Sequence, residues 1–235
     1  MIPAIRNLLL FNQPCRDAWV KRMSEMIPAG SRVLDVGAGS CPYRRLFVHC
    51  EYRTQDFEKL QPEQLRGHQG YGSVDYVGDI CAIPVADASF DVILCTEVLE
   101  HLPEPIRAVT EFGRIVRPGG KILITAPLGS GLHQEPYHFY GGYTPYWYQR
   151  FLAEAGFDDI QIVPNRGYFS FYGQESVRCA LLLAPWKGGR RLLWLPVWCL
   201  GLPWCLCVPL LARFWDRAGW ERTFTVGYHV SARRR

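Results

Sequence analysis

Val33-Leu34-Asp35-Val36-Gly37-Ala38-Gly39-Ser40 is the stretch that decides the fold of this chain. Its first four residues are mostly apolar and predict a short buried strand. Two glycines follow at once, and glycine lets the backbone turn sharply while leaving room for a ligand to lie against it. The stretch therefore predicts a strand that ends in a ligand-binding turn.

An acidic residue, Asp56, follows this turn at a spacing typical of α/β folds that bind nucleotide-like cofactors. It closes residues 52–55, which predict a second strand, and a carboxylate there can accept hydrogen bonds from the two hydroxyls of a ribose. Glu58 is a weaker candidate for the same role. Asp35 and Asp56 also have simpler interpretations, as a polar residue near a strand end and as a helix cap.

Strand and helix patterns alternate along the next hundred residues. Further strands are expected at Asp91 and Lys121. Helices are expected at residues 15–26, 43–49, 108–116 and 151–155, the third ended by Pro118-Gly119-Gly120 and the last by Gly156. This alternation predicts an α/β fold with a mostly parallel sheet and helices on both of its faces.

The glycine turn, Asp56, Gly78-Asp79-Ile80, the strand at residues 89–95 and the segment 117–124 form an ordered set. Together they resemble the class I S-adenosylmethionine (SAM) dependent methyltransferases, over about residues 26–157 and less clearly over 223–232. The resemblance implies a Rossmann-like, doubly wound sheet of seven strands, with SAM as the cofactor.

The resemblance also implies which residues contact SAM. Asp56 would hold the ribose, Asp79 would meet the adenine amino group, and Ile80 would pack on the adenine ring. Asp75 is a weaker rival of Asp79, which has a simpler interpretation as a turn former. The implied cofactor-binding residues are Asp35, Gly37, Ala38, Gly39, Asp56, Asp79, Ile80 and Glu97.

A dinucleotide-binding dehydrogenase is the main competing enzyme, because it shares the strand, the glycine turn and the acidic residue. Its fingerprint has a third glycine three residues after the second, where helix and strand pack closely. Here that position is Pro42, and no matching second half follows. Both features disfavour an NAD-dependent dehydrogenase.

The acceptor side is predicted in the long aromatic loop at residues 128–148, since long loops inside compact domains are usually functional or mobile. This loop resembles a segment of bacterial small-molecule and cell-surface-glycan methyltransferases. His133 is the first candidate for a general base and His138 the second, with Glu135 able to orient either. The simpler interpretation is histidines satisfied within a packed aromatic loop. His101, in the segment 97–102, is expected to position groups rather than act as a base.

The charge and cysteine content limit the other function classes. The net charge is +4, much of it in the tail at residues 233–235, so a nucleic-acid partner is not expected. Nine cysteines occur without a CxxC pair, which favours reduced thiols in the cytosol, and no metal site is expected.

Residues 185–217 predict an apolar insertion that faces a membrane. Residues 192–212 carry no charge, are interrupted by Pro196, Pro203 and Pro209, and contain three tryptophans suited to the water–lipid interface. A strand at 221–232 must then return the chain to the sheet. A shallow or hairpin-like insertion fits best. A buried homodimer interface and a transmembrane helix are the alternatives.

These features predict one methyltransferase domain over residues 1–235. It comprises a helical cover at 1–27, a SAM-binding core at 28–170, the insertion, and the final strand. The expected activity is transfer of a methyl group to oxygen of a small-molecule, glycan or lipid-linked acceptor by a cytoplasmic protein peripheral to the membrane. The alternative of another class is a non-catalytic SAM-binding, membrane-attached partner of a biosynthetic complex.

Overall fold

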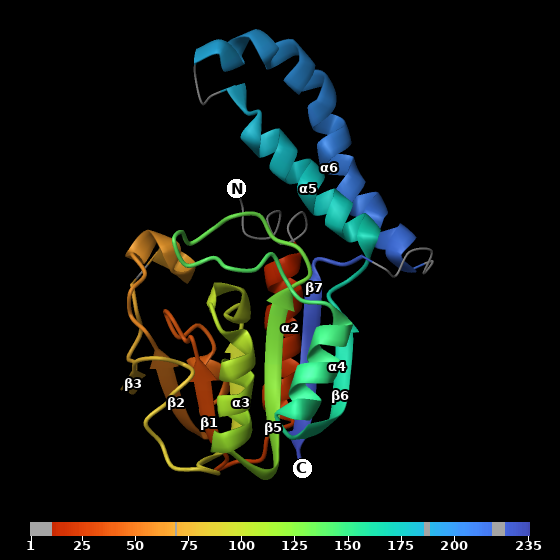
Figure 1. The fold of residues 1–235 in the computed structure, drawn as a ribbon. Coiled ribbons are helices and arrows are strands. Elements are labelled where there is room, and N and C mark those ends of the chain that lie inside the picture. Colours follow the sequence, from red (N-terminus) through yellow and green to blue (C-terminus); the bar gives the residue numbers. More distant parts are fainter. Residues whose placement is uncertain (1–10, 69, 186–188, 218–223) are drawn as a thin grey trace. The chain divides into compact units, whose positions relative to one another are not determined.

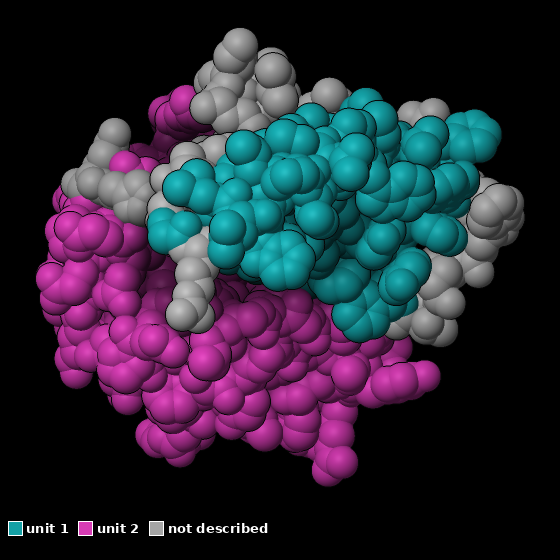
Figure 2. All heavy atoms as spheres, turned by 90° about the horizontal axis from the view of Figure 1, so that it is seen from above, with its two compact units in different colours: residues 1–17, 164–226 teal, residues 18–163, 227–235 magenta. Residues whose placement is uncertain are grey.

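The computed structural model describes residues 11–68, 70–185, 189–217 and 224–235 (Figure 1). The chain forms two compact units, coloured separately in Figure 2. The sheet unit comprises residues 18–163 and 227–235, and the helical unit comprises residues 1–17 and 164–226. The second segment of the helical unit starts at Pro164, and the predicted insertion at residues 185–217 falls within this segment.

A seven-stranded sheet has the strand order β3-β2-β1-β4-β5-β7-β6. Neighbours from β3 to β5 pair in parallel, while β7 runs antiparallel to β5. This confirms the predicted fold class. The strands are β1 Arg32–Val36, β2 Glu51–Asp56, β3 Tyr76–Val77, β4 Phe90–Thr96, β5 Val116–Pro127, β6 Phe157–Pro164 and β7 Gly227–Arg234.

Residues on the central strands are buried on both faces of the sheet. On β1, Leu34 and Val36 belong to one apolar cluster, which includes side chains of α3 (Pro105–Ile115) and α4 (Pro145–Glu154). Val33 belongs to the second cluster, together with Trp19 of α2 (Asn12–Glu25). Such double burial explains the near-continuous apolar runs in parallel strands. It also assigns α2 to packing of the core.

One predicted helix is wrong. Residues 43–49 contain only the 3-10 turn η1 (Arg44–Leu46) instead of an α-helix. Tyr43 and Phe47 are both buried in the second apolar cluster, and β2 starts at Glu51, so the chain must turn back to the sheet within a few residues. In contrast, the short helix predicted at 151–155 is the longer α4, which Thr144 caps by accepting a hydrogen bond from the Trp147 N–H.

The helical unit contains an antiparallel pair, α5 (Tyr168–Leu182) and α6 (Leu195–Arg217), joined through η6 (Gly189–Trp194) (Figure 1). Ser176 Oγ donates to the Cys205 carbonyl at 3.2 Å, and Trp198 Nε1 donates to the Ala180 carbonyl at 2.9 Å. A later residue of α5 thus contacts an earlier residue of α6, which shows that the two helices run antiparallel and form a hairpin.

The prolines of α6, each expected to break or kink a helix, do not end it. Pro203 and Pro209 lie inside the helix, and Pro196 lies in its first turn, where proline is tolerated. Gly173 of α5 makes room for Pro209, because a Cβ on this glycine would lie 2.8 Å from the Pro209 Cα. Figure 1 shows α6 curved along its length, so the prolines bend the helix without ending it.

Both predicted terminal elements reach beyond the described residues. The helical cover at 1–27 includes α2, but residues 1–10 lie outside the described part of the chain. The final strand at 221–232 corresponds to β7, and residues 221–223 likewise lie outside it. β7 inserts between β5 and β6.

Candidate functional site

The glycine turn lies at the carboxyl end of β1. Gly37 has φ 65° and Gly39 has φ 52°, a backbone region that favours glycine. A Cβ on Gly37 would lie 2.4 Å from Val98 Cγ2, so no larger residue fits without displacing that side chain. The Ala38 N–H donates to the Gln55 carbonyl at 3.1 Å and ties the turn to β2.

Asp56 lies at the carboxyl end of β2, beside the turn. Its Oδ2 accepts the Gly39 N–H at 2.8 Å, and its Oδ1 accepts the Glu58 N–H at 3.1 Å. Burial raises the pKa of Asp56, and these backbone donors oppose the rise. The two oxygens of this carboxylate are the kind of acceptor that a ribose diol would need. Glu58, the weaker candidate, is exposed and contributes its backbone N–H.

Asp35 lies in β1, two residues before Gly37, with its side chain buried. Its Oδ2 accepts a hydrogen bond from the hydroxyl of Tyr52 on β2. Burial raises the pKa of Asp35 to about 7, against the hydrogen bond from Tyr52, which lowers it. Asp35 therefore braces β1 against β2 just before the glycine turn.

The residues predicted to lie near the adenine differ in exposure and in hydrogen bonding. Asp79 is exposed, and its Oδ1 accepts the Cys81 N–H at 2.8 Å, which is also the turn-forming role. Ile80 is buried in the first apolar cluster. Asp75, the rival of Asp79, bonds both the Arg53 guanidinium and the Thr54 backbone N–H at 2.9 Å. These bonds give Asp75 a structural role at the edge of the sheet.

Glu97 follows β4 and completes the row of positions at the carboxyl edge of the sheet. It has φ 54°, and its N–H donates to the Thr125 carbonyl at 2.8 Å. The Thr125 hydroxyl in turn donates to Glu97 Oε1 at 2.9 Å. Parallel pairing of β1, β2 and β4 brings Gly37, Asp56 and Glu97 to one edge.

The loop at residues 128–144, here the acceptor loop, is fastened at two places along this edge (Figure 1). The N–H groups of Phe139 and Tyr140 both donate to the Glu100 carbonyl in the 3-10 turn η4 (Leu99–His101). Gln134 Nε2 donates to the Gln64 carbonyl at 2.7 Å, and Gln64 Nε2 donates to the Glu135 carbonyl at 2.9 Å.

The predicted histidines lie together and are joined by His101 of η4. Ring centroids are 4.7 Å apart for His101 and His133, 4.6 Å for His133 and His138, and 5.7 Å for His101 and His138. Burial lowers the pKa of His101 to about 4 and also lowers the pKa of His138, where nearby Glu135 opposes the shift. Both rings are thus neutral near pH 7.

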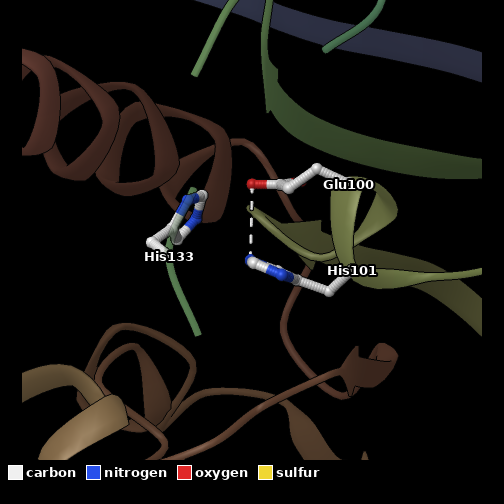
Figure 3. Close-up of side chains that lie close together, drawn as sticks. All are labelled: Glu100, His101 and His133. Carbon is white, nitrogen blue, oxygen red and sulfur yellow. Dashed lines mark ion pairs between the residues drawn. The ribbon is translucent and has the colours of Figure 1, made fainter. Parts of the chain in front are cut away.

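Sequence reasoning missed two residues of this site. Gln64, in the 3-10 turn η2 (Pro62–Gln64), belongs to no motif, and its contact with the acceptor loop depends on tertiary structure. Glu100 lies in the segment 97–102, whose sequence alone predicts no role for it. Its carboxylate lies beside His101 and His133 (Figure 3), a grouping that the predicted absence of a metal site did not anticipate.

Comparisons with known proteins agree with this geometry. Residues 34–124 match the family model described as a methyltransferase domain. An uncharacterized methyltransferase of Mycobacterium sp. (strain JLS) is 32% identical over 135 residues, covering 54% of this chain and 52% of that protein. A ubiquinone biosynthesis O-methyltransferase of Xanthomonas oryzae pv. oryzae (strain PXO99A) is 34% identical over 105 residues, covering 41% of this chain and 43% of the relative. The chain thus spans about half the length of the curated relatives it matches.

A solved structure supports the fold. Phosphoethanolamine N-methyltransferase 2 of Haemonchus contortus, solved with SAM, has a TM-score of 0.53 at 16% sequence identity, covering 94% of this chain and 52% of that one. The matched residues 34–124 begin in β1, end in β5, and contain the glycine turn, Asp56 and Glu97. Residues 34–124 therefore form a methyltransferase domain of the class I SAM-dependent kind.

Proposed function

We propose that this chain transfers a methyl group from SAM to an oxygen of a small-molecule, glycan or lipid-linked acceptor, at the cytoplasmic surface of a membrane. The observation that carries the proposal is the pairing of Asp56 with the glycine turn, through the 2.8 Å bond from the Gly39 N–H. It fixes a buried carboxylate next to a turn in which a Cβ on Gly37 would meet Val98.

These residues fit SAM in shape and in chemistry. Asp56 would accept from the ribose hydroxyls, Ile80 would support the adenine, and the turn at residues 37–39 would admit the amino-acid end. Near Gly78, the buried Oε1 of Gln55 has no hydrogen-bond partner among the described residues and is a further acceptor on the adenine side. When bound, SAM supplies a methyl group that its positively charged sulfur already activates.

The acceptor loop supports an oxygen acceptor. A hydroxyl must lose a proton during methylation, and His133 and His138 are placed at this loop to accept it. The loop is fastened to η2 through Gln64 and to η4 through the Glu100 carbonyl, so it can exclude water from the reaction. The O-methyltransferase among the relatives supports the same acceptor atom.

The methyl-transfer proposal is tested with SAM carrying a labelled methyl group, the full chain and extracts of membrane lipids and glycan precursors. We expect label in an acceptor through an ether or ester oxygen, and loss of transfer in Asp56→Ala. Failure to transfer label to any extract by protein that binds S-adenosylhomocysteine would favour the non-catalytic alternative.

The hairpin of α5 and α6 supports the proposal that the chain binds a membrane surface. Apolar side chains are strongly exposed around its tip, with Leu193 79% and Leu200 82% exposed. Isolated exposed leucines are ordinary, but a contiguous apolar surface marks an interaction site. The exposed apolar residues of this tip are Leu181, Leu182, Leu183, Leu192, Leu193, Trp194, Leu195, Val197, Leu200 and Trp204.

The charges of the hairpin favour a shallow insertion. Among the described residues, one helix, Leu192–Asp216, is long and apolar enough to cross a membrane by length and composition. Its partner α5 carries the Glu175 and Arg178 ion pair at 3.1 Å, which is costly in a bilayer core. Asp216 accepts three backbone N–H groups at the start of α5, far along the helices from the tip. Only the tip is therefore suited to enter the lipid.

Vesicle sedimentation of the full chain tests the membrane proposal. The double variant Leu193→Asp and Leu200→Asp places two charges on the tip and is expected to abolish sedimentation with lipid vesicles. Val48→Asp is the matched control, because Val48 is 83% exposed on the sheet unit. Equal sedimentation of the tip variant and the control would contradict membrane binding through the hairpin.

A further inference from the structure

We infer that Glu100, His101 and His133 bind a divalent first-row transition metal ion on the acceptor side of the domain. One carboxylate oxygen and one nitrogen from each of the two rings lie within 4.8 Å of one another. Figure 3 shows the carboxylate and the two imidazoles gathered around a common space. Glu100 and His101 come from the single turn η4, and His133 comes from the acceptor loop.

The hydrogen bonds of the two rings prepare each of them as a ligand. His101 Nδ1 lies 2.5 Å from the Tyr137 carbonyl, and His133 Nδ1 lies 2.8 Å from the Gly131 carbonyl. Because a carbonyl oxygen only accepts, Nδ1 of each ring carries the proton and donates it. In the neutral form of an imidazole that donates from Nδ1, the lone pair is on Nε2. Metal-binding histidines characteristically fix their tautomer in this way.

The burial of Glu100 supports the same inference. Its side chain is 1% exposed, and its Oε1 lies 3.8 Å from His101 Nε2. Buried charges in proteins are paired or coordinate metal ions. A divalent ion between Glu100 and the two rings would therefore suit this buried carboxylate.

The donor set selects the class of ion. Two imidazole nitrogens and one carboxylate oxygen suit Zn²⁺, Mn²⁺, Fe²⁺ or Co²⁺ better than Ca²⁺ or Mg²⁺, which prefer oxygen ligands. Bonds of about 2.0–2.1 Å place tetrahedral ligands roughly 3.3 Å apart. Metal binding is therefore expected to draw His133 and the acceptor loop toward η4.

The proposed role of the metal ion in catalysis rests on the proposed methyl transfer. The binding of the ion does not. Three protein ligands leave a position for an acceptor hydroxyl, whose pKa the ion would lower. The hydroxyl proton passes to His138, the oxygen forms a bond to the methyl carbon, and the carbon–sulfur bond breaks with its electron pair going to sulfur. His133 is then a metal ligand, and His138 remains as the proton acceptor.

Cobalt binding tests the inference without requiring turnover. Chelator-treated full-chain protein is titrated with Co²⁺, and visible absorption reports the coordination. We expect one equivalent with nitrogen and oxygen ligation, and affinity reduced more than about tenfold in His133→Ala and Glu100→Gln. His133 is exposed, so its variant avoids the folding risk of changing buried Glu100. His49→Gln is the matched control, because His49 hydrogen-bonds the Ile27 carbonyl outside this cluster.

Three results would overturn the metal site. These are no stoichiometric Co²⁺ binding, sulfur-to-cobalt charge transfer indicating ligation by cysteines, or equal affinity in His133→Ala and His49→Gln. Titration of the same preparations with S-adenosylhomocysteine separates the two proposals. Binding of the nucleoside without Co²⁺ overturns only the metal site, whereas binding of Co²⁺ without the nucleoside overturns the proposed function and leaves the metal site standing.

Discussion

Two aspartates at neighbouring strand ends have different roles, although the sequence presents them alike. Asp56 is bonded by the Gly39 N–H beside the turn, whereas Asp35 is bonded by Tyr52. The strand pattern placed both residues near the glycine turn. It could not show that the Tyr52 hydroxyl would bond Asp35, because that bond depends on the packing of Tyr52 from another strand.

At Asp56, we expect Asp56→Ala to weaken S-adenosylhomocysteine binding by ~1.5–3 kcal/mol, since charge-assisted hydrogen bonds to the ribose are lost. Calorimetric titration measures the change. Asp75→Ala is the control, because Asp75 bonds Arg53 and Thr54 and should affect stability more than affinity. An unchanged affinity in folded Asp56→Ala would remove Asp56 from the site.

At Gly37, Gly37→Ala is expected to reduce both stability and affinity. The backbone strain of a non-glycine residue at positive φ costs ~1–3 kcal/mol, and the new Cβ also meets Val98. Gly30→Ala separates the two effects, because Gly30 has φ 77° with nothing within 4 Å of a Cβ. Thermal unfolding and nucleoside titration check the difference. Equal losses in both variants would show that the contact with Val98 has no consequence.

Asp35 gives the stability of the protein a specific pH dependence. Its pKa of about 7 in the folded protein lies above the ordinary value of 3.8, so the folded chain holds a proton that the unfolded chain releases. The stability from this group is present at low pH and is lost as the pH rises to about 7, by up to ~1.4 kcal/mol per pH unit. Relative to Asp35→Asn, the natural protein should therefore lose stability between pH 5 and 7. Parallel denaturant-unfolding profiles would contradict this.

At the scale of elements, the strands were more predictable than the turns and loops. The apolar runs within β1, β4 and β5 are buried on both faces of the sheet and therefore have a strong sequence signal. The segment at 43–49 has apolar residues at helical spacing too, but Tyr43 and Phe47 are used to anchor a turn between closely following strands. The local sequence pattern cannot distinguish a helix from a turn here unless the start of the next strand is known.

The acceptor loop is expected to loosen in Gln64→Ala, which removes the side-chain donor to the Glu135 carbonyl. Hydrogen exchange should quicken in residues 128–144, while affinity for S-adenosylhomocysteine stays within about twofold, since a surface hydrogen bond contributes ~0.5–1.5 kcal/mol. Gln161→Ala provides the control, because Gln161 Nε2 donates to Asp159 Oδ1 within β6, outside the acceptor loop. Exchange that changes equally in both variants would show that Gln64 does not hold the loop.

At the scale of the whole molecule, the chain contains two units. The sheet unit carries the ordered motifs of the methyltransferase domain, and the helical unit carries no such motifs. The ordered motifs from β1 to β5 predicted the first. The apolar composition of residues 192–212 predicted the second only as an insertion, because its pairing with α5 depends on Gly173 and Ser176, which have no motif. The segment from Pro164 to Val226 therefore contains α5 as well as the predicted insertion.

The most direct measurement is calorimetric titration of the detergent-solubilised full chain with S-adenosylhomocysteine, with NAD as the comparison ligand. The account predicts saturable binding of S-adenosylhomocysteine at one site, weakened in Asp56→Ala, and no binding of NAD. Binding of NAD alone, or of neither ligand, would contradict the assignment of the glycine turn and Asp56 to SAM.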